Sequence, residues 1–161
     1  MAARARAVGI CVTIAFTLSS GACGNNTRED EATKDAIRQQ ISKYTAALDA
    51  ADTDLAGQVW LTSPDASLIH PAGYAHGWEE VKGFYKFFGS AFSYRKLTAR
   101  EITVHVNGDT AWAEFYWHFV GKQSNGGRAM ETDGRETQVY KRAGGRWQLV
   151  QAHYSSPVVM R

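Results

Sequence analysis

Hydrophobic positions in the first half of the chain recur at helical spacing. The clearest run has apolar side chains at intervals of four, three and four residues, which predicts an amphipathic helix. Its members are Ile37, Ile41, Tyr44 and Leu48. Two shorter helices and one short strand are expected after it, in the order helix 53–60, strand 67–70 and helix 78–88.

The period of the pattern changes in the second half of the chain. Ile102, Val104 and Val106 alternate with polar residues, which predicts a strand. Turns rich in Asn and Gly separate three further apolar segments, which we expect to form strands at about 110–120, 130–141 and 147–154. Helices followed by a run of antiparallel strands predict a single α+β domain with the helices on one face of the sheet.

The segment from Ala111 to Phe119 has aromatic side chains on both faces of its predicted strand. Phe115 and Trp117 belong to one face, while Trp112 and Tyr116 belong to the other. A half-buried strand would show one apolar and one charged face. One face is expected to pack on the helices and the other to meet a second subunit or a ligand cavity, and the pattern leaves their assignment open.

Residues 1–22 differ in composition from the rest of the chain. Arg4 and Arg6 precede an apolar run over residues 7–18, and small residues follow, which is the order of a secretory signal. The apolar run is shorter than the roughly 18 residues needed to span a bilayer. We therefore expect a signal peptide at 1–22 and an exported protein without a membrane-spanning segment.

Cys23 directly follows these small residues, as the modified cysteine of bacterial lipoproteins does. Ser20 stands where such signals usually carry Leu, so ordinary cleavage near Ala22 is the alternative. We expect lipidation of Cys23, a flexible tether over 23–29 and a folded domain over 30–158. The protein would then be periplasmic or on the cell surface, and its lipid anchor would be its sole contact with a bacterial membrane.

Loss of the signal removes several kinds of chemistry from consideration. Both cysteines, Cys11 and Cys23, lie in it or at its edge, which leaves the domain without a free thiol. Without the two signal arginines, 16 basic residues balance 16 acidic residues, and no basic patch indicates nucleic acid. The domain has no phosphate-binding glycine loop, and its histidines have no metal-ligand spacing. We expect neither a cofactor nor a metal.

Two stretches of the sequence together resemble a known family. They are SLIHPAG at 67–73, followed by GWEEVKGF at 77–84, and GRWQLVQAHYSSP at 145–157. Their order and spacing resemble the SnoaL-like and DUF4440 branches of the nuclear transport factor 2-like (NTF2-like) superfamily. The resemblance implies a cone in which three N-terminal helices pack on a curved, mainly antiparallel sheet and enclose a pocket. It also implies assembly as a homodimer.

That superfamily contains ketosteroid isomerase, cyclases and dehydratases beside members without any chemistry, so the fold alone does not settle the function. The isomerase pattern is matched only in part. His70 stands where the isomerase has its general-base Asp, and Tyr44 matches its oxyanion-binding Tyr. Its second acidic position falls near Thr137. A steroid isomerase as such is therefore not expected.

Histidines are the main candidates for chemistry in this domain. An imidazole such as that of His70 has an ordinary pKa of roughly 6.5, which suits a general base near neutrality. His153 shares strand parity with Trp147 and Leu149, and it would point into the cone if they face the core. The alternative for either histidine is a hydrogen-bonded ring that only shapes the structure.

Aromatic side chains are expected to form the wall of the pocket, although the same residues could equally form the core. The predicted ligand-binding set is Trp60, Trp78, Phe84, Phe88, Trp112, Arg135 and Thr137.

Three functions follow from these candidates. The first is binding of a small, largely apolar molecule that His70, His153 and Tyr116 orient. The second is a cofactor-free isomerase, cyclase or dehydratase in which His70 transfers a proton and Tyr44 or Tyr116 stabilises the oxyanion. The third is an interaction module of the envelope whose outer sheet face serves dimerisation or binds a partner.

Overall fold

The structure of the protein is a computed structural model that describes the backbone of residues 22–157 and the side chains of residues 28–157. The predicted signal peptide lies outside the described residues except for its last position, and the Cys23 side chain lies outside them as well. Within the described range, no helix is both long and apolar enough to cross a bilayer. The elements are α1 (Ala22–Ala50), α2 (Thr53–Val59), β1 (Ser67–His70), β2 (Gly73–His76), α3 (Trp78–Ala91), β3 (Phe92–Asn107), β4 (Thr110–Gln123), β5 (Ala129–Ala143) and β6 (Arg146–Ser155).

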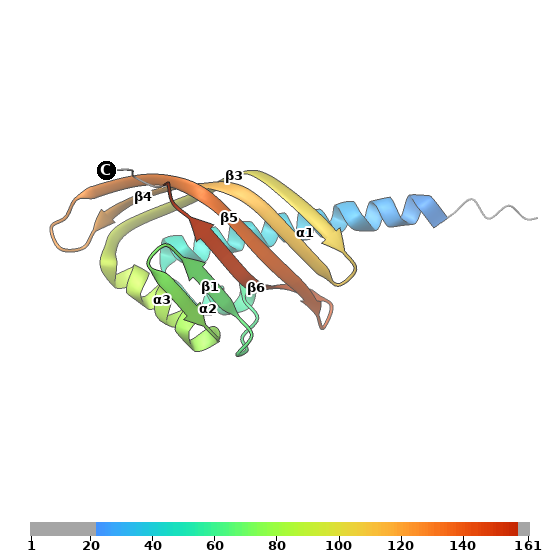
Figure 1. The fold of residues 1–161 in the computed structure, drawn as a ribbon, viewed down its shortest axis with the longest axis horizontal. Helices are drawn as coiled ribbons and strands as arrows, with labels where there is room; N and C mark the ends of the chain where they lie inside the picture. Colours follow the sequence, from blue (N-terminus) through green and yellow to red (C-terminus); the bar gives the residue numbers. More distant parts are fainter. Residues whose placement is uncertain (1–21, 158–161) are drawn as a thin grey trace, which may run out of the picture.

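The six strands form one curved sheet that arches over the helices (Figure 1). Its strand order is β2-β1-β6-β5-β4-β3, and every neighbouring pair is antiparallel except β1 and β6, which run parallel. Helix α1 packs along β3 on the concave face of the sheet, and α2 and α3 close the same side near β1 and β6. The predicted α+β cone is confirmed.

Helix α1 begins at Ala22, well before the domain boundary expected from the sequence. Residues 23–29, which we assigned to a flexible tether, are helical. No proline occurs before Pro64, and extending an existing helix is far easier than nucleating one. The N-terminal part of α1 consequently projects beyond the edge of the sheet (Figure 1).

Two strand assignments from the sequence are corrected by the structure. Residues 73–76, expected to be loop, form β2 and pair with β1 in a tight hairpin. Only Ala75 of this strand is buried, and one buried residue cannot produce the alternation of apolar and polar residues that identifies a strand in sequence. Strand β3 begins at Phe92, ten residues before the expected start, because its pairing with β4 is irregular between Arg100 and Thr103 and the alternation breaks there.

Arg95 connects α1, α3 and β3 at the point where α3 ends and β3 begins. Its guanidinium donates hydrogen bonds to main-chain carbonyls at the end of α1 (Asp49), near the end of α3 (Phe88 and Gly89) and at the start of β3 (Phe92). These carbonyls have no partner within a helix, and a cation at a helix C-terminus also offsets the helix dipole. One side chain thereby fixes where α1, α3 and β3 meet.

Candidate functional site

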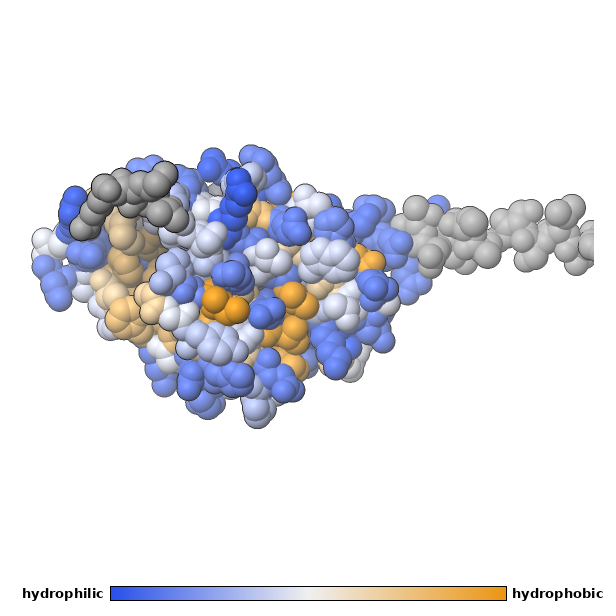
Figure 2. All heavy atoms as spheres, in the orientation of Figure 1, coloured by the Kyte–Doolittle hydropathy of each residue, from blue (hydrophilic) through white to orange (hydrophobic). Residues whose placement is uncertain are grey.

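A cavity of about 480 Å³ lies between the concave face of the sheet and helices α1 and α3. Figure 2 shows apolar side chains around a hollow at the end of the molecule where α3 meets β3. Most of the lining is aromatic or aliphatic, with a few polar groups among it. The lining residues are Tyr44, Leu48, His70, Pro71, Ala72, Phe84, Phe88, Leu97, Trp117, Phe119, Met130, Thr132, Glu136, Tyr154 and Ser156.

Strand β4 answers the question that its sequence left open. Phe115, Trp117 and Phe119 are buried on the concave face, whereas Tyr116 is 39% exposed on the convex face. Trp112 shares that convex face and stacks on His105 with ring centroids 4.9 Å apart. The concave face therefore lines the cavity, and the convex face is left to solvent or a partner.

Four of the predicted site residues consequently lie away from the cavity, on the convex face. The guanidinium of Arg135 lies over the ring of Tyr116, with its Cζ 5.2 Å from the ring centroid. Arg135 and Thr137 are exposed on β5, and Trp112 is on β4. Sequence alternation identified the two faces of these strands correctly but not which one the helices cover.

His153 also lies outside the cavity, and its expected inward direction is wrong. The pairing of β5 with β6 shifts register after Tyr140–Leu149, so that Val139 next pairs with Gln151 and Val150 is an extra residue. Such a bulge reverses the parity of the strand beyond it. Leu149 and Ala152 both point inward as a result, and His153 is exposed while Tyr154 faces the cavity.

His70 lies at the end of β1, as the sequence predicts, and its ring lines the cavity. The imidazole packs between Phe84, at a centroid distance of 5.1 Å, and Tyr154, at 5.9 Å and nearly parallel. Burial lowers the pKa of His70 because the charged form loses hydration among these rings. The ring is therefore neutral at neutral pH and has the form that accepts a proton.

Glu136 is the polar group that the sequence analysis did not select, since the expected acidic position fell one residue further, at Thr137. Its side chain points into the concave face and is only 3% exposed. The Gln138 amide donates to its Oε1 at 2.7 Å, and the Tyr140 hydroxyl donates in turn to Gln138. The alternation of Glu136, Gln138 and Tyr140 along β5 is the sequence signal of this buried polar row.

Burial raises the pKa of Glu136 from 4.5 to about 7, although hydrogen bonds from Gln138 and Tyr44 oppose the rise. Tyr44 comes from α1 and is buried beside this carboxylate, in the position that the family resemblance implied. Burial, followed by the nearby Glu136 charge, raises the pKa of Tyr44 well above its usual range, so its hydroxyl remains a donor.

The remaining predicted aromatic residues divide between cavity and core. Phe84 and Phe88 line the cavity and stack on each other with ring centroids 5.4 Å apart. Trp60 is fully buried in the core, where its indole nitrogen donates to the Tyr85 hydroxyl at 3.0 Å. Trp78 is partly buried and packs against the core from the first turn of α3, outside the cavity lining.

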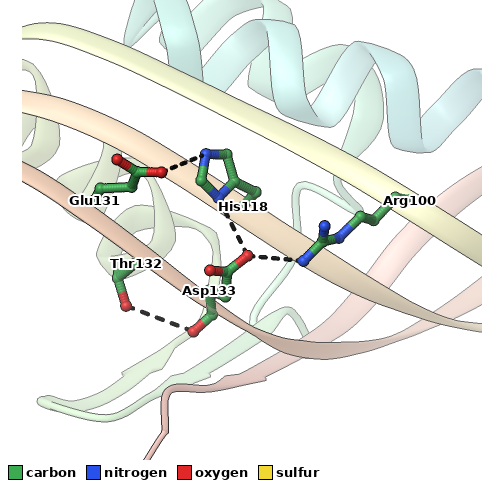
Figure 3. A network of polar contacts seen from close by, with 5 residues as sticks. All are labelled: Arg100, His118, Glu131, Thr132 and Asp133. Carbon is green, nitrogen blue, oxygen red and sulfur yellow. Dashed lines mark hydrogen bonds and ion pairs between the residues drawn. The ribbon is translucent and has the colours of Figure 1, made fainter.

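A separate polar network covers part of the convex face (Figure 3). Asp133 accepts from Arg100 at 2.8 Å and contacts His118 Nδ1 at 3.1 Å, while Glu131 lies 3.5 Å from the other ring nitrogen. The two carboxylates approach opposite edges of the ring and do not converge on one point. Among the residues with described side chains, no group of three or more His, Cys, Asp or Glu could hold a metal ion.

The fold and the site together define a class of protein, in which a curved sheet and helices form a cone around an apolar cavity that contains a histidine and a buried acid. A family profile described as SnoaL-like domain matches residues 37–159. The chain belongs to the SnoaL-like domain family.

Solved structures agree with this assignment. An NTF2-like superfamily protein from Salmonella enterica serovar Typhimurium is 36% identical, covers 81% of this chain and 95% of its own, and superposes with a TM-score of 0.77. Two others share the fold at lower identity. A hexachlorocyclohexane dehydrochlorinase from Novosphingobium barchaimii has 15% identity, coverage of 79% and 88%, and a TM-score of 0.70. A protein with a cystatin-like fold from Caulobacter vibrioides is 18% identical, covers 78% of this chain and 89% of its own, and superposes with a TM-score of 0.67. A search of curated proteins gives no match.

Proposed function

We propose that this protein binds a small, largely apolar molecule in the cavity between the sheet and the helices. The observation that carries the proposal is the cavity itself, about 480 Å³ in volume and walled mainly by aromatic and aliphatic side chains. A few polar groups that converge on an apolar cavity are what fixes the orientation of a bound small molecule. Here those groups are His70, Tyr44 and Glu136, in place of the His70, His153 and Tyr116 that the sequence suggested.

Filling the cavity should abolish binding without unfolding the protein. Thr132→Phe would introduce a ring from the concave face of β5, whereas Thr137→Phe would add the same ring to the convex face of that strand. Molecules that co-purify with residues 24–161 would be identified by mass spectrometry of the denatured protein. We expect the ligand with the parent and with Thr137→Phe but not with Thr132→Phe. Equal recovery from all three proteins would contradict the proposal.

A second candidate function is cofactor-free proton transfer in the same cavity. A neutral His70 provides a base, while the Tyr44 hydroxyl and the protonated form of Glu136, which exists below its pKa of about 7, provide two donors; such a division of roles is typical of acid–base sites. His70 would take a proton from carbon while Tyr44 and Glu136 donate hydrogen bonds to the oxygen that gains charge. Isomerases, cyclases and dehydratases use such a step.

Deuterium exchange separates the two candidates. Tetralone, a flat ketone with an exchangeable α-proton, would be incubated with the protein in D₂O and followed by NMR. Enzymatic proton transfer predicts exchange above the buffer rate that His70→Gln abolishes and that His153→Gln retains, since His153 lies outside the cavity. Binding of tetralone without accelerated exchange would leave the binding function alone.

Export of the protein is part of the proposal and is supported by the order of charged, apolar and small residues in 1–22. A diacylglyceryl mass on Cys23 would be sought in membranes of a bacterial host that expresses the full chain, with Cys23→Ala as the control. Finding the unmodified chain with its first residues intact in the cytoplasm would contradict export.

Association of two copies through the convex face is the third candidate, and the exposed Tyr116 beneath Arg135 favours it. Aromatic and Arg side chains are enriched in protein interfaces. Sedimentation of the domain and of Tyr116→Glu tests it, because a charge on this ring should dissociate a dimer formed there. A parent protein that sediments as a monomer at micromolar concentration would contradict it.

A further inference from the structure

The cavity has an uneven balance of charge. Of the described side chains that line it, none is Lys or Arg, while Glu136 is an acid. His70 adds no positive charge near neutrality, because burial lowers its pKa. The rest of the lining is mainly aromatic and aliphatic. A bound anion would find no cationic group in this lining.

The hydrogen bonds around Glu136 all run toward its carboxylate. The Tyr140 hydroxyl donates to Gln138, and the Gln138 amide donates to Glu136. Tyr44 lies in the same cavity lining, and its hydroxyl favours the ionised form of this carboxylate. Glu136 is therefore the acceptor at the end of a directed chain, and no ion pair links it to any cation in the described part of the protein.

Aromatic rings complete the surroundings of this acid. Tyr154 stands edge-on to Trp117 at a centroid distance of 5.9 Å, and both rings line the cavity together with Phe84. Ring faces attract cations, and the attraction strengthens when water is excluded. A buried carboxylate without a cationic partner attracts a cation more strongly than a ring face does.

We propose that the natural ligand is a small ring-bearing amine, held as its ammonium ion against Glu136 with its ring among the aromatic side chains. This inference rests on the proposed binding function and narrows it to one class of ligand. The ammonium supplies the missing counter-ion of Glu136 and donates to its carboxylate, which already accepts from the Gln138 amide. A carboxylate ligand would place two like charges in one cavity.

The pH dependence of binding follows from the groups that face Glu136. These are Tyr44, Gln138, Tyr85, Tyr140 and Tyr154, and burial raises the pKa of each tyrosine so that all remain neutral. Glu136 has a pKa of about 7 and so changes charge between pH 6 and 8. An alkyl ammonium, with a pKa near that of Lys at roughly 10, stays charged throughout. Amine affinity should therefore rise by about tenfold from pH 6 to pH 8.

The experiment uses naphthylmethylamine, naphthylmethanol and naphthoate, which share one ring system and differ in charge. Titration calorimetry on the mature domain at pH 8 should show the amine binding about tenfold tighter than the alcohol, the difference expected of a hydrogen bond to a charged group. Naphthoate should bind weakest. Glu136→Gln should remove the advantage of the amine and its rise with pH, while Glu114→Gln, an acid on the convex face of β4, should preserve both.

The outcomes separate this inference from the proposed function. Equal affinity for amine and alcohol, or an advantage that survives Glu136→Gln, overturns the amine assignment and leaves apolar binding intact. Tighter binding of tetralone than of the amine would also overturn the amine assignment, and only accelerated exchange of its α-proton would support proton transfer. Failure of all three naphthyl compounds to bind would contradict the proposed binding function itself, and the amine assignment with it.

Discussion

The two faces of β4 have nearly the same aromatic content and opposite roles. Phe115, Trp117 and Phe119 pack into the core, and the last two line the cavity, while Glu114, Tyr116 and His118 alternate with them on the convex face. On the concave face Phe119 packs on Phe88 of helix α3 and Trp117 packs on Tyr154, whereas the convex rings of Tyr116 and His118 contact charged side chains. Coverage by the helices, and not residue type, therefore decides what each ring does.

The acids of β5 show the same contrast. Asp133 lies on the convex face, half exposed, with Arg100 and His118 beside it. Glu136, three residues later, lies on the concave face without a cationic partner in the described structure, and burial raises its pKa to about 7. An exposed acid forms ion pairs that water weakens, while a buried one becomes a group that a ligand or a proton must satisfy.

Removal of one ring from each face should give the largest difference. Trp117→Ala deletes a side chain that is 4% exposed and should destabilise the fold by about 3–5 kcal/mol. Tyr116→Ala removes its exposed neighbour and should cost about 1 kcal/mol or less. Urea unfolding followed by circular dichroism measures both values. Similar losses for the two variants would mean that a partner or other contact covers the convex face.

The pH dependence of stability should identify Glu136 as a buried acid. Because its folded pKa is raised, the folded state binds a proton that the unfolded state releases. This contribution is fully present below about pH 4.5 and is lost as pH rises through about 7, with a total of about 3 kcal/mol. Glu136→Gln should remove this part of the slope in urea unfolding at pH 5 and pH 8. Glu114→Gln should keep it, and an unchanged slope in Glu136→Gln would contradict the assignment.

Most of the fold could be predicted because its signals are local. The periodicity of Ile37, Ile41 and Tyr44 gives α1, and the alternation of Ile102, Val104 and Val106 gives the end of β3. Strand β2 and the start of β3 could not be found, since one has a single buried residue and the other is interrupted by an irregular pairing. Those features depend on partner strands, which a local pattern does not contain.

The site could be predicted less completely. His70 stands in the family motif at 67–73 and Tyr44 on the first helix, where it was matched to the isomerase Tyr, and both line the cavity. His153 was misdirected by one extra residue in β6, and Thr137 took the position of Glu136 by an offset of one. Since strand side chains alternate, a single-residue shift moves a side chain to the opposite face of the sheet. To predict which face a side chain near a bulge occupies, the register of the strand pairing must be known in addition to the sequence pattern.

Gly134 provides a smaller test of the concave face. It pairs with Trp117 in the sheet, and a methyl group at this position would overlap the Trp117 indole and the Ser155 carbonyl oxygen. Gly134→Ala should therefore cost about 1–3 kcal/mol through overpacking. Gly83→Ala, in the middle of α3 with open space around it, should instead stabilise the protein by about 0.5–1 kcal/mol. Thermal unfolding compares the two, and a neutral Gly134→Ala would show that both the Trp117 ring and the main chain at Ser155 shift without cost.

The convex network should give the smallest effect. Asp133→Asn removes the ion pair with Arg100, whose side chains are both about half exposed, and surface pairs of this kind contribute roughly 0.2–1 kcal/mol. We expect a loss of about 0.5 kcal/mol at low salt that vanishes near 1 M salt, because mobile ions screen exposed charges. Urea unfolding at both salt concentrations measures it, with Asp109→Asn, an acid in the β3–β4 turn, as the control. A loss above about 2 kcal/mol that persists in salt would mean that water is excluded from this face, as a subunit interface over Tyr116 would do.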